Sequence, residues 1–154
     1  MLRIFLLCVT SLTVYFIILL AKINNTMSYL QLAYLHLGTI FPAFLIGLLM
    51  LMTQKGTARH RLFGKIYMLL MLTTAVITLF MTAQVGARLF GHFGFIHLFS
   101  LFVLYSIPAA YFAIRQGKVK QHQYHMLGVY IGGILIAGAF TFMPGRLLHT
   151  WFIA

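Results

Sequence analysis

The segment from Leu30 to Met52 reads LQLAYLHLGTIFPAFLIGLLMLM and contains no Lys, Arg, Asp or Glu. A helix needs about 20 predominantly apolar residues to cross the hydrocarbon core of a bilayer, so this segment alone predicts a membrane span. Similar stretches precede and follow it, separated by short polar or basic loops. The chain is therefore predicted to be an all-α integral membrane protein with five transmembrane helices, the last four forming a four-helix core. The predicted spans cover about residues 4–21, 30–52, 63–85, 93–114 and 126–152.

The composition of the whole chain supports this class. Of its 154 residues, 62% are hydrophobic and only 7% are charged, against about 25% in ordinary soluble domains. The chain has 11 Lys and Arg and no Asp or Glu, so it can form neither a carboxylate acid–base pair nor an oxygen cage for calcium or magnesium. Nucleic-acid binding is disfavoured because the basic residues lie between apolar stretches of membrane length. The single cysteine, Cys8, excludes a disulfide within one chain.

The basic residues are distributed unevenly among the predicted loops. Cytoplasmic loops of membrane proteins are enriched in Lys and Arg. We therefore expect the N-terminus and the more basic loops to face the cytoplasm, and the C-terminus to lie outside. The basic residues on the cytoplasmic side are Arg3, Lys55, Arg59, Arg61, Lys65, Arg115, Lys118 and Lys120, against Lys22, Arg88 and Arg146 on the other side.

Four of the seven histidines are predicted to form two layers within the bundle. His36 and His97 each lie about one turn into helices that run inwards, about 25 and 27 Å from the cytoplasmic ends of those helices, so they share an outer layer. His60 and His122 open helices that run outwards and share an inner layer. Imidazoles on alternate helices can bind haem iron from its two faces, with His125 and His92 as alternative ligands.

This arrangement suits one or two b-type haems. Glycines near the histidines leave room for a flat ring, and basic residues near both layers can balance the anionic propionates. The glycines are Gly38, Gly64, Gly94 and Gly128, and the basic residues are Arg59, Arg61, Lys118, Lys120 and Arg146.

Simpler interpretations remain open for the same residues. A single interfacial histidine can bond to a lipid headgroup or a backbone carbonyl, and the basic residues can act only as determinants of topology. A copper or zinc site of histidines alone is a further candidate at the outer face, formed by His92, His97 and His149.

Small and polar residues inside the spans are predicted to be structural. Thr74, Thr78 and Thr82 are expected to hydrogen-bond to the preceding turn or to a neighbouring helix. Gly128 and Gly132 have the GxxxG spacing that permits close helix packing. The prolines lie inside predicted spans, where they are expected to kink the helices without ending them; they are Pro42, Pro108 and Pro144.

Two parts of the chain repeat one pattern. Residues 53–67 and residues 115–130 both contain a basic loop and a histidine, followed by a glycine and a tyrosine that enter a helix. This repetition predicts that the second and third spans are related to the fourth and fifth spans as pairs.

Three motifs resemble those of a bacterial membrane-protein family known as domain of unknown function 2306. The first is Lys55-Gly56-Thr57 with His60-Arg61 and Gly64, and the second is Gly91-His92-Phe93 with Ile96-His97-Leu98 and Ser100. The third runs from Lys118 through His122, Met126, Gly132-Gly133, Ala137-Gly138 and Phe140-Thr141-Phe142 to Pro144-Gly145-Arg146. The resemblance covers about residues 30–150 and implies a place in the bacterial cytoplasmic (inner) membrane, but no activity.

In architecture the chain also resembles the cytochrome b561 group, whose four-helix core holds two b-type haems. This resemblance implies that His36 and His97 hold one haem, and that His60 and His122 hold the other.

We therefore expect a transmembrane electron carrier that holds one or two b-type haems by paired histidines. Its partner would be a quinol, a cytoplasmic reductant or a redox partner protein. The alternative is a cofactor-free helical subunit or homo-oligomer, whose cations face lipid phosphates or the carboxylates of a partner membrane protein. The lack of Asp and Glu argues against a proton pump built on carboxylate relays, and no catalytic residue is assigned.

Overall fold

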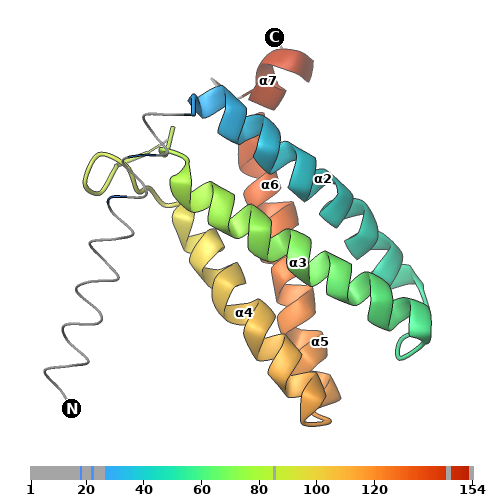
Figure 1. Ribbon diagram of the computed structural model, residues 1–154. Coiled ribbons are helices and arrows are strands. Elements are labelled where there is room, and N and C mark those ends of the chain that lie inside the picture. The colour runs from blue at the N-terminus through green and yellow to red at the C-terminus, as the bar shows by residue number, and fades with distance from the viewer. Residues whose placement is uncertain (1–17, 19–21, 23–26, 85, 145–146, 153–154) are drawn as a thin grey trace, which may run out of the picture.

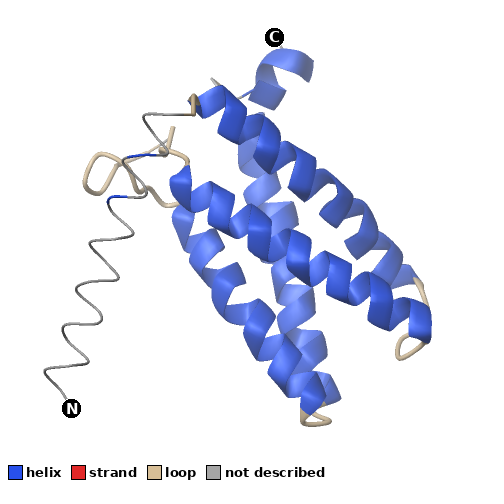
Figure 2. Cartoon of the chain, viewed as in Figure 1, coloured by secondary structure: helices blue, strands red, loops and turns tan. Residues whose placement is uncertain are grey.

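The computed structural model describes residues 18, 22, 27–84, 86–144 and 147–152. Its elements are α2 (Tyr29–Met52), α3 (Ala58–Phe80), α4 (His97–Arg115), α5 (Val119–Gly128), η1 (Val129–Ile136), α6 (Ala137–Ala139), η2 (Phe140–Phe142) and α7 (Leu147–Phe152). Figure 1 shows the long helices running up and down in one bundle, and Figure 2 shows that short loops connect them. α2 packs against α3, α3 against α4, and α4 against α5, while α2 also contacts η1 and so closes the bundle.

Four helices of the described chain are long and apolar enough to cross a membrane. They are Tyr29–Met52, Ala58–Phe80, His97–Arg115 and Val119–Phe142. The prediction of an all-α chain with several helices able to cross a membrane is thereby confirmed for the described residues. Large apolar side chains cover the outside of the bundle, as a surface in contact with lipid requires; examples are Leu49, Leu69, Leu101 and Phe112. The first predicted span, residues 4–21, lies almost wholly outside the described residues.

The ends of the helices differ from the predicted ones. α3 begins at Ala58 rather than 63, because the Thr57 side chain accepts a hydrogen bond from the His60 backbone N–H at 3.1 Å and caps the helix. The last spanning helix begins at Val119 rather than 126. Apolar runs mark only the part of a helix that lipid surrounds, whereas these helices continue into the polar residues at their ends.

The prediction that Pro144 kinks the last helix is wrong. That helix ends at Phe142, and Pro144 lies in a turn before α7. The residue before a proline is driven out of the helical region, and Met143 has the extended conformation φ −70°, ψ 150°. Pro42 and Pro108 lie inside α2 and α4 as expected.

The last spanning helix is irregular. Its α5 segment passes into η1, which is a π-helix, and then into α6 and the 3-10 turn η2. Turns closed by i→i+5 bonds are rare and frequently occur at functional sites.

Small residues bring the helices close together at the centre of the bundle. A Cβ added to Gly47 of α2 would lie 2.6 Å from the ring of Tyr130 and 3.0 Å from the ring of Tyr67. Both tyrosines are buried, and both belong to the repeated sequence pattern. Gly128 and Gly132 face the ring of Phe102, where added Cβ atoms would lie at 3.3 and 3.5 Å, consistent with the predicted packing role.

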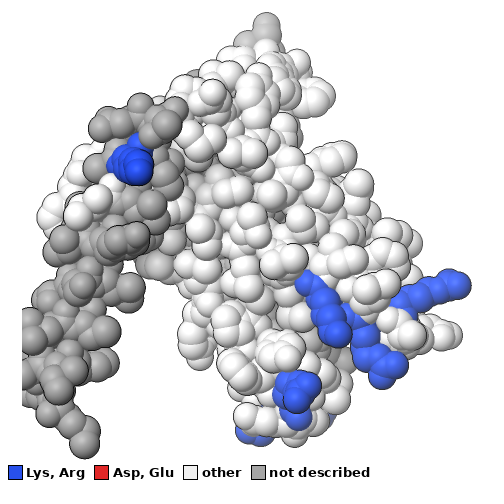
Figure 3. All heavy atoms as spheres, in the orientation of Figure 1, with Lys and Arg blue, Asp and Glu red and all other residues white. Residues whose placement is uncertain are grey.

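Basic residues gather at one end of the bundle, which we call the basic end. It contains the α2–α3 and α4–α5 turns, and Figure 3 shows the basic side chains projecting from both. All of them are exposed, and because the chain has no carboxylate side chain, none of them can pair with one inside it. They are Lys55, Arg59, Arg61, Lys65, Arg115, Lys118 and Lys120.

The close contact at Gly47 gives a testable prediction. Gly47→Ala should overpack the core, which costs about 1–3 kcal/mol, against a gain of about 1 kcal/mol in helix propensity. Gly38→Ala on the same helix is the matched control, since a Cβ there meets nothing within 4 Å. Thermal unfolding in detergent should give a lower Tm for Gly47→Ala than for Gly38→Ala. Equal Tm values would contradict the close approach of α2 to Tyr130.

Candidate functional site

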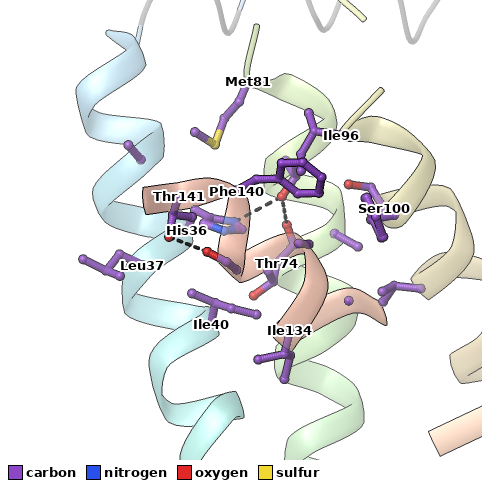
Figure 4. A pocket seen from close by; sticks show the side chains of 18 of the residues that line it. His36, Leu37, Ile40, Thr74, Met81, Ile96, Ser100, Ile134, Phe140 and Thr141 are labelled. Atoms are coloured by element: carbon purple, nitrogen blue, oxygen red, sulfur yellow. Dashed lines mark hydrogen bonds between the residues drawn. The ribbon is translucent and has the colours of Figure 1, made fainter. Parts of the chain in front are cut away.

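A cavity of about 620 Å³ lies between α2, α3, α4 and the second half of the last spanning helix (Figure 4). It occupies the end of the bundle opposite the basic end, and its volume is within the range of small-molecule sites, about 300–1,000 Å³. Most of its wall is apolar, including Leu37, Ile40, Phe44, Met71, Val103, Ile134 and Phe140. The polar side chains on the wall include His36, Thr74, Thr78, Ser100 and Thr141.

The hydrogen bonds of His36 determine which of its ring nitrogens is free. His36 Nδ1 lies 3.1 Å from the hydroxyl oxygen of Thr78 on α3. That hydroxyl has one proton and donates it to the Thr74 carbonyl at 2.9 Å, so its oxygen must accept the proton of His36 Nδ1. In the neutral ring, Nε2 then carries a lone pair. This nitrogen has no hydrogen-bond partner in the part of the chain that the structure describes, and the ring lies in the cavity.

The threonine hydroxyls around His36 donate their protons in hydrogen bonds to other groups of the protein. Thr74 donates to the Thr39 hydroxyl at 2.6 Å, and Thr39 donates in turn to the carbonyl of His36 at 2.9 Å. Thr141 donates to the Gly138 carbonyl at 2.6 Å. The predicted structural role is thereby confirmed for Thr74 and Thr78, which bond to a neighbouring helix and to the preceding turn.

His97 lies outside the wall of this cavity and closes the end of α3 instead. Its Nδ1 accepts a hydrogen bond from the Gly94 N–H at 3.0 Å, so Nε2 carries the proton and donates it to the Met81 carbonyl at 3.0 Å. His92 acts in the same way, with Nε2 bonded to the Leu79 carbonyl at 3.0 Å. The last carbonyls of a helix have no partner within it, and these two imidazoles supply one. The structure therefore does not bring His36 and His97 to a common space.

His60 and His122 both lie at the basic end, in the first turns of α3 and α5. His122 Nδ1 donates to the Ala110 carbonyl at 3.0 Å, which leaves the lone pair of a neutral ring on Nε2. His60 Nδ1 is buried and has no hydrogen-bond partner among the described residues. Each ring therefore has a nitrogen without a hydrogen-bond partner among the described residues.

The other predicted site residues take no part in these two groups. The ring of His125 packs against Tyr105 and Tyr124, with ring centroids 6.1 and 6.2 Å away. Arg61 is exposed at the basic end, and Arg146 lies outside the described residues.

The predicted copper or zinc site of three histidines is not formed. Within residues 27–84, 86–144 and 147–152, no group of three or more His, Cys, Asp or Glu side chains is arranged to hold a metal ion. The ring nitrogens of His92 and His97 bond to backbone groups at the end of α3 and its connection to α4, which explains why they do not converge on an ion with His149.

Two features of the site were missed by sequence reasoning. The cavity depends on how four helices pack, and no sequence pattern reports it. The capping role of His92 and His97 had a usable signal, because they lie in and directly after the connection that follows an apolar helix without a polar C-cap. The regular spacing of Thr74 and Thr78 did predict hydrogen bonds, but not that they would orient His36.

The family model described as "Predicted membrane protein (DUF2306)" matches residues 33–151 of the chain. No curated protein and no solved structure gives a significant match.

The capping role of His97 can be tested by hydrogen exchange. His97→Leu should remove the bond that protects the Gly94 amide, and a net loss of about 1 kcal/mol corresponds to about fivefold faster exchange there. His149→Leu on α7 is the control and should leave exchange at Gly94 unchanged. Unchanged protection of Gly94 in His97→Leu would show that this bond does not hold the α3–α4 connection.

Proposed function

Because the chain belongs to the DUF2306 family of predicted membrane proteins, whose description states no activity, we propose its function from its histidines. The proposed function is that of a membrane electron carrier with a b-type haem held between His60 and His122. The observation that carries it is the pair of imidazoles at the basic end, each with a ring nitrogen that has no hydrogen-bond partner among the described residues.

The surroundings of the pair suit an axial ligand set. Histidines that bind metal usually donate their other ring N–H to a carbonyl or carboxylate, as His122 does to Ala110. A histidine ligand is neutral, which suits a position at the edge of a membrane. Gly64, one turn after His60, gives clearance, since a Cβ there would meet only the flexible end of Met50 at 3.5 Å.

The charge at the basic end also suits a haem. Haem propionates are anionic, and Arg59, Arg61, Lys118 and Lys120 flank the two histidines in the sequence and are exposed. The haem would supply a one-electron couple at its iron, while the protein would hold the ring, limit its contact with water and balance its charge.

A second haem at the cavity end stays a prediction. His36 offers Nε2 there, but His97 would have to release the Met81 carbonyl and the Gly94 amide before it could bind iron. Our proposal therefore needs one haem, and the ratio of haem to protein tests it.

The orientation and location belong to the same proposal. The excess of Lys and Arg at the basic end supports a cytoplasmic location of that end. In a bacterial inner membrane, the haem would then lie near the cytoplasmic face, within reach of a cytoplasmic reductant, and the cavity would open near the outer face.

The haem proposal is tested by visible spectra and by the haem-to-protein ratio of protein purified in detergent. We expect one haem per chain, with the sharp reduced bands of a six-coordinate b-type haem. His60→Ala and His122→Ala should each lose most of the bound haem, because iron would keep a single imidazole. His125→Ala is the matched control on the helix that carries His122, and it should keep the wild-type haem content.

Two results would overturn the proposal. Retention of wild-type haem content by both His60→Ala and His122→Ala would exclude this ligand pair. A colourless protein, after expression with sufficient haem, would instead favour the cofactor-free subunit, whose exposed cations need an acidic partner or lipid.

A further inference from the structure

We propose that the cavity binds a lipid-soluble aromatic compound with a hydroxyl group, and that this hydroxyl donates a hydrogen bond to His36 Nε2. The inference does not depend on a haem at the basic end, because it rests on different residues at the opposite end of the bundle. It assigns the cavity a ligand of the phenol and quinol class.

The cavity contains a hydrogen-bond acceptor, His36 Nε2. His36 Nε2 is held as a lone pair because Nδ1–H is fixed on Thr78, whose own proton goes to the Thr74 carbonyl. A polar nitrogen in a membrane interior that has no partner is unfavourable, so a ligand that can donate to it is strongly preferred over one that cannot.

The absence of charge on the wall narrows the class of ligand. Among the described residues that line the cavity there is no Lys or Arg, so an anionic head would find no counter-charge. The hydroxyl protons of Thr74, Thr78 and Thr141 are already donated to other groups of the protein. The ligand should therefore be neutral and carry a donor for His36 Nε2, while the hydroxyls of Ser100 and Tyr29 on the same wall offer further polar contacts.

The shape and chemistry of the wall argue for an apolar ring. Leu37, Ile40, Ile134 and Phe140 surround His36 in Figure 4, so the space next to Nε2 is bounded by apolar side chains. Gly138 belongs to the wall, and a Cβ there would meet nothing within 4 Å, so the cavity has open space on the side of the last helix.

Trp151 provides a reporter for binding. It is the only tryptophan of the sequence, it lies on α7, and Leu148 of the same helix lines the cavity. Its fluorescence can be followed while purified, detergent-solubilised protein is titrated with 4-nonylphenol or with 4-nonylanisole, the methyl ether that has the same shape but no donor. We expect saturable binding of the phenol and about tenfold weaker binding of the ether.

Three variants distinguish a hydrogen bond to His36 from non-specific hydrophobic binding of the ligand. His36→Phe should abolish the preference for the phenol over the ether, and His36→Gln, which retains an acceptor, should restore part of it. Thr78→Val should reduce the preference several-fold, because the His36 ring loses the partner that keeps its proton on Nδ1. The melting temperature of each variant shows whether it folds.

A pair of glycine variants tests the place of binding. Gly138→Leu should fill the cavity and weaken both ligands, whereas Gly38→Leu, at an exposed position outside the wall, should leave both affinities unchanged. Equal effects of the two variants would place the binding elsewhere.

Two further results would overturn the inference. One is equal affinity for the phenol and its ether in the wild-type protein. The other is a ratio of two haems per chain that falls to one in His36→Phe, which would assign the cavity to haem.

Titration with an alkyl hydroquinone and its dimethyl ether then distinguishes the sources of the aromatic hydroxyl, because a site restricted to quinols would bind the hydroquinone and not the nonylphenol.

Discussion

A bilayer offers no hydrogen-bond partners to the groups inside it. Each polar side chain within the bundle must therefore bond to another group of the protein or to a bound ligand. His92 and His97 donate to carbonyls that α3 leaves free at its end, so both rings are used to close that helix. His36 and His122 bond through Nδ1 instead, one to a threonine hydroxyl and one to a carbonyl, and keep Nε2 open. His92 and His97 thus find their hydrogen-bond partners within the protein. His36 and His122 each keep a ring nitrogen without a partner among the described residues, and these two histidines mark the proposed sites.

Charge makes the two ends of the bundle different. The chain has no carboxylate side chain, so the exposed cations at the basic end repel one another and have no Asp or Glu to pair with in the chain. α3 and α5 also begin at this end, where the positive pole of a helix disfavours cations such as Arg59 and Lys120. An anionic group is favoured there on both grounds. The cavity end has the opposite character, since its apolar wall and lone-pair acceptor favour a neutral ligand.

The four helices that are long and apolar enough to cross a membrane were predictable from the sequence, because length and apolar content alone identify them. The helix ends were not, since Thr57 caps α3 before its apolar run begins, and Pro144 excludes the residue before it from the helix. The predicted depth of His36 rests on the helical rise, and the predicted place of His122 rests on its position at the start of a helix. Which of their nitrogens is free could not be predicted, because Thr78 and Ala110 lie on other helices, and a sequence pattern does not report such contacts.

The π-helical segment Val129–Ile136 has a consequence for how this protein can change over time. Each turn closed by an i→i+5 bond contains one residue more than an α-helical turn. Deleting a single residue there would remove the extra residue and allow a regular α-helix, whereas the same deletion in a regular α-helix would rotate everything that follows by about 100°. Gly138, Phe140 and Thr141 would therefore keep facing the cavity. Lineages that shorten this segment by one residue are expected to keep both their membrane topology and the wall of the cavity.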